Sequence, residues 1–151
     1  MVDTLSPEQR RLCMSRIAGK NTKPELVIRK ALFRQGFRYK LHDKNLPGKP
    51  DLVFPEYNAV IFIHGCFWHG HNCDLFNWPT TNTKFWRKKI TGNREADLKN
   101  YNYLKKEGWY ILTIWGCALK GKKKKPLNKI VKSVESWLLY ETRNKTIRGQ
   151  S

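Results

Sequence analysis

The stretch AVIFIH, residues 59–64, decides the fold of this chain. Its first five residues are apolar, so both faces of the strand that it predicts must be covered, as in a central strand of a sheet. WYILTIW, residues 109–115, is a second candidate of the same kind. Apolar residues at every second position of 37–41 and a short strand that begins at Asp51 predict two further strands.

Helical patterns occur on both sides of these strands. They cover residues 6–18, residues 22–36, a pair at 84–90 and 93–107 broken near Gly92, and a segment that begins at Pro126. Ser6 and Thr22 are each followed three residues later by Gln or Glu, which is the spacing of a capping box. We therefore expect one mixed α/β domain over residues 1–140, with helices flanking a central sheet, and a disordered tail at 141–151.

The chain carries a large excess of positive charge. Thirty Lys and Arg against twelve Asp and Glu give a formal charge of +18, which indicates a polyanionic partner. No stretch approaches the ~20 apolar residues of a spanning helix, and the first ten residues lack the apolar core of a signal peptide. We expect a cytoplasmic protein that binds nucleic acid and no membrane. The basic helix of residues 6–20 and the lysine run at 120–125 are either solvated surfaces or phosphate contacts.

Asp51 is a candidate catalytic carboxylate. It stands where a loop enters a strand, close in sequence to a neighbouring strand that ends in His64. Nucleases use such a carboxylate because a divalent metal needs a hard oxygen ligand beside the scissile phosphate. The dipeptide Pro50–Asp51 alone is more typical of a turn. Glu25 is either a second carboxylate at the metal or only a member of the capping box, and His42 is expected to have no chemical role.

The segment HGCFWHGHNC, residues 64–73, combines metal-binding and aromatic residues. Cys66, His71 and Cys73, with Cys117 after the second apolar strand, could supply the four ligands of a structural zinc site, although buried inert thiols are the alternative. His64 and His69 would then remain for a general base and a phosphate contact. The pair at 67–68, Phe and Trp, belongs either to the core or to a wedge that enters a base stack.

Four stretches together carry a resemblance to a known family. LPGKPD, IFIHGCFWHGHNC, TNTKFWRKKI and WYILTIWGCAL occur in an order and spacing that strongly resembles the very short patch repair (Vsr) DNA mismatch endonucleases, from about Ser6 to Trp137. The resemblance implies a restriction-endonuclease-like fold. It also implies nicking of one strand of duplex DNA 5′ of a thymine mispaired with guanine, the lesion left when 5-methylcytosine deaminates.

The same resemblance assigns the catalytic residues. Asp51 becomes the central magnesium ligand, His69 activates the attacking water, His64 acts at the scissile phosphate and Glu25 supports the water shell of the metal. Ile63 stands where we expect threonine and would bind magnesium through its backbone carbonyl. Most restriction-like nucleases carry a Glu-x-Lys motif at the end of the strand that corresponds to residues 59–64. This chain lacks the motif there, which fits a histidine as the general base.

The resemblance also assigns zinc ligands, DNA contacts and partners. Cys66, His71, Cys73 and Cys117 become the ligands of a structural Zn²⁺. The aromatic wedge comprises Phe67, Trp68 and Trp86, and the helix of residues 6–20 enters the minor groove from the opposite side through Met14 and Ile17. A cytosine-C5 methyltransferase is a functional partner and mismatch-repair proteins are a further class, while nicking one strand needs only a monomer.

Two other functions are compatible with the sequence. The first is a restriction-like nuclease that cuts another lesion or sequence with the same acid and histidines. The second is a non-enzymatic, zinc-stabilised protein that bends DNA with its aromatic residues, in which Asp51 is only a turn residue. Dependence of cleavage on a mismatch separates the first from the Vsr-like function, and any cleavage that requires Asp51 excludes the second.

Overall fold

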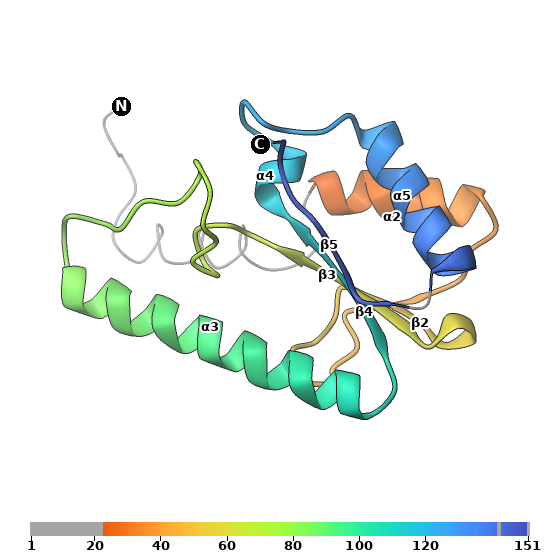
Figure 1. Ribbon diagram of the computed structural model, residues 1–151, viewed down its shortest axis with the longest axis horizontal. Coiled ribbons are helices and arrows are strands. Elements are labelled where there is room, and N and C mark those ends of the chain that lie inside the picture. The colour runs from red at the N-terminus through yellow and green to blue at the C-terminus, as the bar shows by residue number, and fades with distance from the viewer. Residues whose placement is uncertain (1–22, 142, 151) are drawn as a thin grey trace.

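A five-stranded sheet forms the centre of the computed structural model, which describes residues 23–141 and 143–150 (Figure 1). Its strands are β1 (Lys40–Leu41), β2 (Leu52–Phe54), β3 (Ala59–His64), β4 (Tyr110–Trp115) and β5 (Lys145–Ile147), and they lie side by side in this order. The first three are antiparallel, whereas β3, β4 and β5 are parallel. The stretch AVIFIH is thus a central strand, as predicted.

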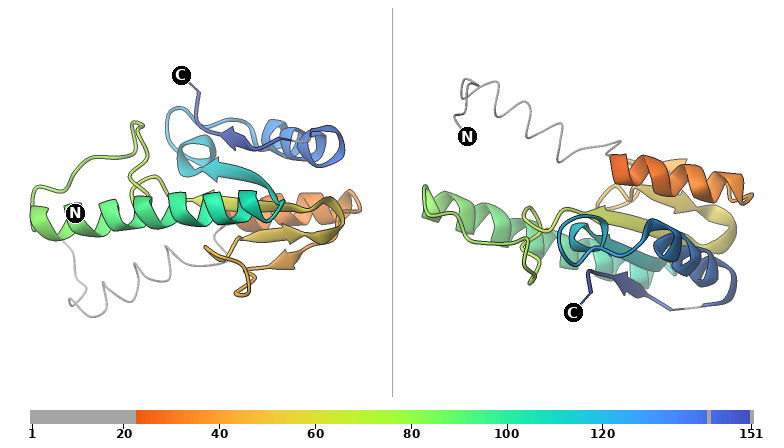
Figure 2. Two further views of the ribbon diagram at one scale, coloured as in Figure 1. Left: turned by 60° about the horizontal axis from the view of Figure 1, so that its bottom comes forward. Right: turned by 90° about the horizontal axis from the view of Figure 1, so that it is seen from above.

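Helices cover both faces of this sheet. They are α2 (Lys23–Arg34), α3 (Thr83–Lys106), α4 (Gly116–Leu119) and α5 (Leu127–Tyr140), with a 3₁₀ turn, η1, at Pro55–Tyr57. Helices α2 and α5 pack together on one face and α3 crosses the other (Figures 1 and 2). The prediction of a mixed sheet flanked by helices is confirmed.

Alternating strand residues divide the core into two layers. Leu52, Ile61 and Leu112 point toward α2 and α5, where they pack against Ile28 and Trp137. The intervening strand residues point toward α3 and form a smaller cluster, which comprises Val53, Val60, Phe62, Leu104 and Ile111. This period of two is the pattern of a sheet covered on both faces, and it explains why the central strands read as continuous apolar runs.

The predicted break in the helical region 84–107 is wrong, because α3 runs without interruption from Thr83 to Lys106. Gly92 is exposed, and a Cβ at this position would meet no atom within 4 Å. Glycine inside a helix costs roughly 0.5–1 kcal/mol relative to alanine. Burial of Ile90 before the glycine and Leu104 after it offsets this cost.

The predicted disorder of residues 141–151 is also wrong where the structure describes them. Residues Lys145–Ile147 form β5 and pair with β4, and Ile147 is 4% exposed. The tail lacks an apolar pattern because its position depends mostly on backbone hydrogen bonds, which any side-chain composition permits.

Smaller differences concern the N-terminal part. The strand predicted at 37–41 shortens to the two residues of β1. The helix of residues 6–20, with Met14 and Ile17, lies outside the described residues. Among the helices that the structure describes, none is both long and apolar enough to cross a membrane.

Candidate active site and metal centres

The start of β2 and the end of β3 meet at one edge of the sheet. These strands are antiparallel, so Asp51, directly before β2, lies beside the last residues of β3. The backbone N–H of Ile63 donates a hydrogen bond to Asp51 Oδ2 over 2.6 Å. The carboxylate is therefore held in place by the neighbouring strand rather than by the loop that precedes it.

Glu25 and His42 join Asp51 at this edge. Glu25 belongs to α2 and is 1% exposed, and His42 directly follows β1. Nε2 of His42 lies 3.1 Å from Glu25 Oε1 and 3.8 Å from Asp51 Oδ1. Arg29, one turn further along α2, contacts Glu25 Oε2 at 2.9 Å. Glu25 is thus brought to Asp51 as expected, and His42, for which no chemical role was expected, lies beside both carboxylates.

This group has the chemistry of a cation site. Its three potential ligand atoms lie within 4.8 Å of one another. Burial, together with the negative charge of Glu25, raises the pKa of Asp51 to about 7, although the Ile63 N–H acts in the opposite direction. A divalent cation would relieve this unfavourable burial of negative charge. Carboxylates suit Mg²⁺ and Mn²⁺, so the donors present fit a catalytic divalent metal.

A histidine pair lies at the end of β3 and in the following loop. The rings of His64 and His69 are stacked, with centroids 3.9 Å apart and planes 7° from parallel. Nδ1 of His69 contacts Asp97 Oδ2 on α3. A carboxylate on Nδ1 fixes the tautomer of the ring, so Nε2 is the nitrogen that can accept a proton.

The two histidines differ in their surroundings. Burial, with the adjacent His69, lowers the pKa of His64 to about 3, despite the opposing charge of Asp97. His64 is therefore neutral at physiological pH and can donate one hydrogen bond. A pocket of about 340 Å³ opens beside the pair, and its walls include Arg94, Asn100 and Trp115.

Asp97 was not identified from the sequence. It lies four residues after Asn93, whose Nδ2 donates a hydrogen bond to the backbone oxygen of Trp68 over 2.8 Å. Two polar residues at this spacing share one helix face, which is the only signal that the sequence offered. Such a pair is ordinary on a charged helix, and only the packing of α3 against residues 64–73 gives it a role.

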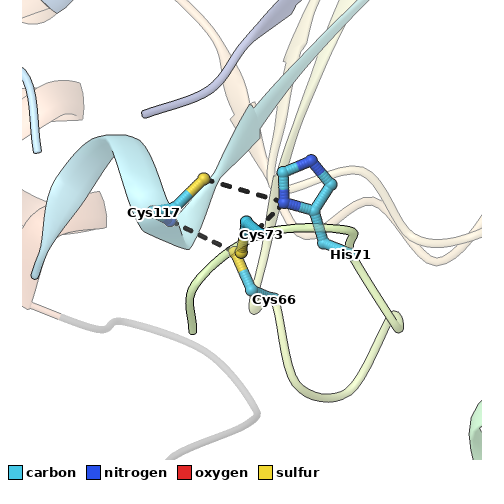
Figure 3. A group of neighbouring side chains, drawn as sticks. All are labelled: Cys66, His71, Cys73 and Cys117. Carbon is cyan, nitrogen blue, oxygen red and sulfur yellow. Dashed lines mark hydrogen bonds between the residues drawn. The ribbon is translucent and has the colours of Figure 1, made fainter. Parts of the chain in front are cut away.

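The three cysteines and one histidine predicted to bind zinc come together at the end of β4 (Figure 3). Nδ1 of His71 lies 3.5 Å from Cys66 Sγ and 3.6 Å from Cys117 Sγ, and all four ligand atoms, including Cys73 Sγ, lie within 4.8 Å of one another. Tetrahedral zinc with ordinary Zn–S and Zn–N lengths separates such atoms by about 3.5 Å. The side chains therefore fit a structural metal ion of this kind.

The electrostatics of the cluster also favour a cation. Burial, with the thiols of Cys73 and Cys117 beside it, raises the pKa of Cys66 to about 12. Burial, with the charge of Arg148, lowers the pKa of His71, which favours the neutral ring that a metal requires. A metal ion would stabilise thiolates that the protein alone disfavours. The interpretation as inert thiols is less consistent with four ligand atoms converging on one point.

Trp115 connects this cluster to the histidine pair. Its ring stacks on that of His71, with centroids 4.0 Å apart and planes 7° from parallel. It also makes a T-shaped contact with the ring of His64, with centroids 5.4 Å apart. The backbone N–H of Gly149 donates to Cys117 Sγ over 3.2 Å, so the C-terminal segment also supports the cluster. Two of the four candidate ligands, Cys66 and His71, thus flank His69 in the chain, so a bound metal would hold the loop that carries it.

Three aromatic side chains gather beside this loop. Phe67, Trp68 and Trp86 have ring centroids 5.3 to 5.7 Å apart, and each is partly exposed. Phe85, the next residue along α3 from Trp86, is 60% exposed. The main-core rings of Phe37, Phe54 and Trp137 are buried, and the three rings beside the loop belong to neither core cluster, which favours the wedge interpretation over the core one.

Known proteins resemble this chain over most of its length. A model of the family "DNA mismatch endonuclease Vsr" matches residues 2–75. The DNA mismatch endonuclease Vsr of Escherichia coli is 40% identical over 141 residues, which is 93% of this chain and 90% of that protein. The chain belongs to the Vsr family. The type II nicking enzymes V.NmeAIP of Neisseria meningitidis and V.XorIIP of Xanthomonas oryzae are each 45% identical, over 89% and 79% of this chain and 98% and 88% of their own lengths.

The Vsr residue assignments can now be placed in the structure. Two groups converge: the carboxylates with His42, and the histidine pair with Asp97. Exposed basic residues of α3 include Lys84, Arg87, Lys88, Lys89, Arg94 and Lys99, and Arg94 also lines the pocket beside the histidine pair. A polyanion could therefore lie along α3 next to this pair. The Vsr-type DNA contacts expected from Met14 and Ile17 lie outside the described residues.

Proposed function

We propose that this protein nicks one strand of duplex DNA 5′ of a thymine mispaired with guanine, in a Mg²⁺-dependent reaction that initiates very short patch repair. Membership of the Vsr family supports a DNA endonuclease. The observation that carries the proposal is that Ile63, whose N–H holds Asp51, is followed directly by His64, whose ring stacks on the His69 that Asp97 contacts. Hydrolysis of a phosphodiester needs a cation at the phosphate and a base for the water, and these groups supply both.

The carboxylate group would bind the metal. Asp51 would be its central ligand, Glu25 would support its water shell, and Ile63 would contribute its backbone carbonyl. Bound Mg²⁺ supplies electrostatic stabilisation of the charge that develops on the phosphate. The N–H of Ile63 on Asp51 Oδ2 keeps one carboxylate oxygen occupied, so Oδ1 is the oxygen directed toward a cation.

The histidine pair would handle protons at the phosphate. His69 would take a proton from the attacking water at Nε2, because Asp97 holds Nδ1. His64 is neutral and would donate its N–H to a phosphate oxygen. Stacking of the two rings keeps them close, so the phosphate and the water can be held by adjacent groups.

The sheet supports a restriction-endonuclease-like fold with a modified catalytic strand. Most such nucleases carry Glu-x-Lys at the end of the strand beside the metal-binding acid. Here Phe62, Ile63 and His64 occupy the end of β3, so no lysine is available at that place. A histidine base would replace it. A structural Zn²⁺ bound by Cys66, His71, Cys73 and Cys117 would hold the segment that carries this base.

Mismatch recognition would depend on deformation of the duplex. Phe67, Trp68 and Trp86 would enter the base stack beside the lesion, while Met14 and Ile17 would enter the minor groove from the opposite side. Insertion costs a few kcal/mol per unstacked step and least at a mismatch. Discrimination would therefore begin with the ease of opening the mispair, and the positive charge would supply affinity that salt weakens.

The cellular setting follows from this chemistry. A cytosine-C5 methyltransferase would create the 5-methylcytosine whose deamination gives the substrate, and mismatch-repair proteins would be further partners. We place the enzyme in the cytoplasm, associated with the nucleoid while it acts on DNA. It would act as a monomer, with residues 1–140 as the catalytic domain.

The decisive test is nicking of end-labelled duplexes in Mg²⁺, matched and G·T-mismatched, by the wild type and by Asp51→Ala. We expect cleavage of only the mismatched thymine strand by the wild type and none by the variant. Equal cleavage of both duplexes would indicate a restriction-like nuclease with another target. Bending of DNA without any nicking would indicate an architectural protein.

A further inference from the structure

His42 is positioned by the strand that carries the metal-binding acid. Its backbone N–H donates to the carbonyl oxygen of Asp51 over 3.1 Å, which continues the antiparallel pairing of β1 with β2 beyond Leu41 and Leu52. Its φ is 46°, in the left-handed region, which costs a residue other than glycine on the order of 1–3 kcal/mol. The imidazole is thus fixed next to Asp51 at a cost in backbone strain.

The ring nitrogen faces both carboxylates. Nε2 lies 3.1 Å from Glu25 Oε1 and 3.8 Å from Asp51 Oδ1, and the His42 side chain is only 11% exposed. Adjacent ligands of an octahedral ion with metal–ligand distances near 2.1 Å are about 3 Å apart, and opposite ligands are about 4.2 Å apart. The separation of 3.1 Å from Glu25 Oε1 is close to that of adjacent ligands, and the separation of 3.8 Å from Asp51 Oδ1 lies between the values for adjacent and opposite ligands. The three donors can therefore share one ion.

A purely structural role for His42, as a hydrogen-bond donor that orients Glu25, explains less. Glu25 already has a charged partner, because Arg29 Nη1 contacts its Oε2 at 2.9 Å. The position of Nε2 between carboxylates from two different elements is the geometry of a shared ligand.

We propose that His42 is a direct nitrogen ligand of the catalytic metal, so that the site has two carboxylate donors and one imidazole donor. The inference rests on the proposed function, because the ion concerned is the one that serves strand cleavage. Imidazole binds transition metals better than it binds Mg²⁺. This enzyme therefore binds Mn²⁺ in preference to Mg²⁺ more strongly than a site built from oxygen ligands alone would.

Metal binding in the absence of DNA tests the proposal without any measurement of activity. Zinc-loaded protein is titrated with Mn²⁺, and pulsed EPR then detects nitrogen coupled to the bound ion. We expect a ¹⁴N coupling in the wild type that changes to a ¹⁵N coupling when only the histidines are ¹⁵N-labelled. It should persist in His64→Gln and disappear in His42→Gln. Absence of the coupling in the wild type, or its loss in His64→Gln with retention in His42→Gln, would overturn the proposal.

Affinities give a second readout. His42→Gln should weaken Mn²⁺ binding about tenfold or more, within the range typical of lost metal-site interactions, and change Mg²⁺ binding much less. Equal weakening of both ions would show that His42 only orients Glu25 and would overturn the proposal. If the wild type nicks the mismatched duplex but shows no nitrogen coupling, the proposed function stands and His42 is rejected as a ligand. If it shows the coupling but does not nick the duplex, His42 stands as a ligand and the proposed function is rejected.

Discussion

The imidazole rings of His64 and His69 are stacked face to face, with centroids 3.9 Å apart. Two protonated rings at this distance would repel each other, so the pair accommodates at most one positive charge. Asp97 contacts His69, and burial lowers the pKa of His64 to about 3. In the proposed reaction, the proton taken from water would therefore go to His69, the ring that a carboxylate contacts.

Asp97→Asn should reduce the single-turnover nicking rate by about 10²- to 10⁴-fold, the range that general acid–base catalysis contributes. The amide cannot stabilise a protonated His69 or enforce its tautomer. Binding of mismatched DNA should change little. The matched control is Glu95→Gln, an exposed residue two positions earlier on α3, which should leave the rate unchanged. A rate for Asp97→Asn within threefold of the wild type would exclude this role.

The pKa of Asp51, raised to about 7, predicts that metal binding releases a proton near neutral pH. Mg²⁺ affinity should therefore rise as the pH increases from about 6 to 8. Calorimetry in buffers of different ionisation enthalpy measures the release. The proton release should vanish in Asp51→Asn, and affinity that is independent of pH would contradict the prediction.

The raised pKa of Asp51 also affects the stability of the protein when no catalytic metal is bound. The pKa of Asp51 in the folded state lies above the ordinary value of 3.8. The stability that Asp51 contributes to the folded state is therefore fully present below pH 3.8 and is lost as the pH rises through about 7. Urea unfolding of the zinc-loaded protein at several pH values should show this decline. Added Mg²⁺ should reverse it, because the cation stabilises the ionised carboxylate. A decline that Asp51→Asn retains would point to another group.

Gly149 and Gly92 form a matched pair of substitutions. A Cβ at Gly149 would lie 2.7 Å from the backbone oxygen of Cys117 and 3.0 Å from that of Lys123, so Gly149→Ala should displace the segment that donates to the Cys117 sulfur. We expect Gly149→Ala to lower the free energy of unfolding by about 1–3 kcal/mol and to speed the transfer of zinc to a chelator. Gly92→Ala should instead stabilise α3 by roughly 0.5–1 kcal/mol. Equal effects of the two would refute this account.

Trp86→Ala should lower the preference for mismatched over matched duplex by about 10- to 100-fold, since a stacked ring contributes roughly 1–3 kcal/mol. Cleavage rates on the two duplexes under single-turnover conditions measure this ratio. Tyr140→Ala is the control, because Tyr140 is 80% exposed at the end of α5, away from the aromatic group. An unchanged ratio in Trp86→Ala would remove this residue from recognition.

Local patterns were enough for several elements and for one site. The apolar run at 59–64 predicted a central strand, and the helical pattern that begins at Pro126 predicted α5. The Cys and His residues of the segment 66–73 predicted a group of possible metal ligands, which the structure brings together with Cys117. In each case the pattern is carried by residue types with a strong tendency to be buried or to bind metal.

The sequence by itself determined the strands at the centre of the sheet, the charge that attracts DNA and the residues able to bind metals. Only the tertiary structure decided that α3 continues through Gly92, that residues 145–147 pair with β4, that Asp97 contacts His69 and that His42 lies beside Glu25. The physical reason is that burial and metal affinity are properties of a side chain. Strand pairing and the roles of ordinary polar residues depend instead on which distant backbone or side chain lies opposite, and that is settled by packing of the whole chain.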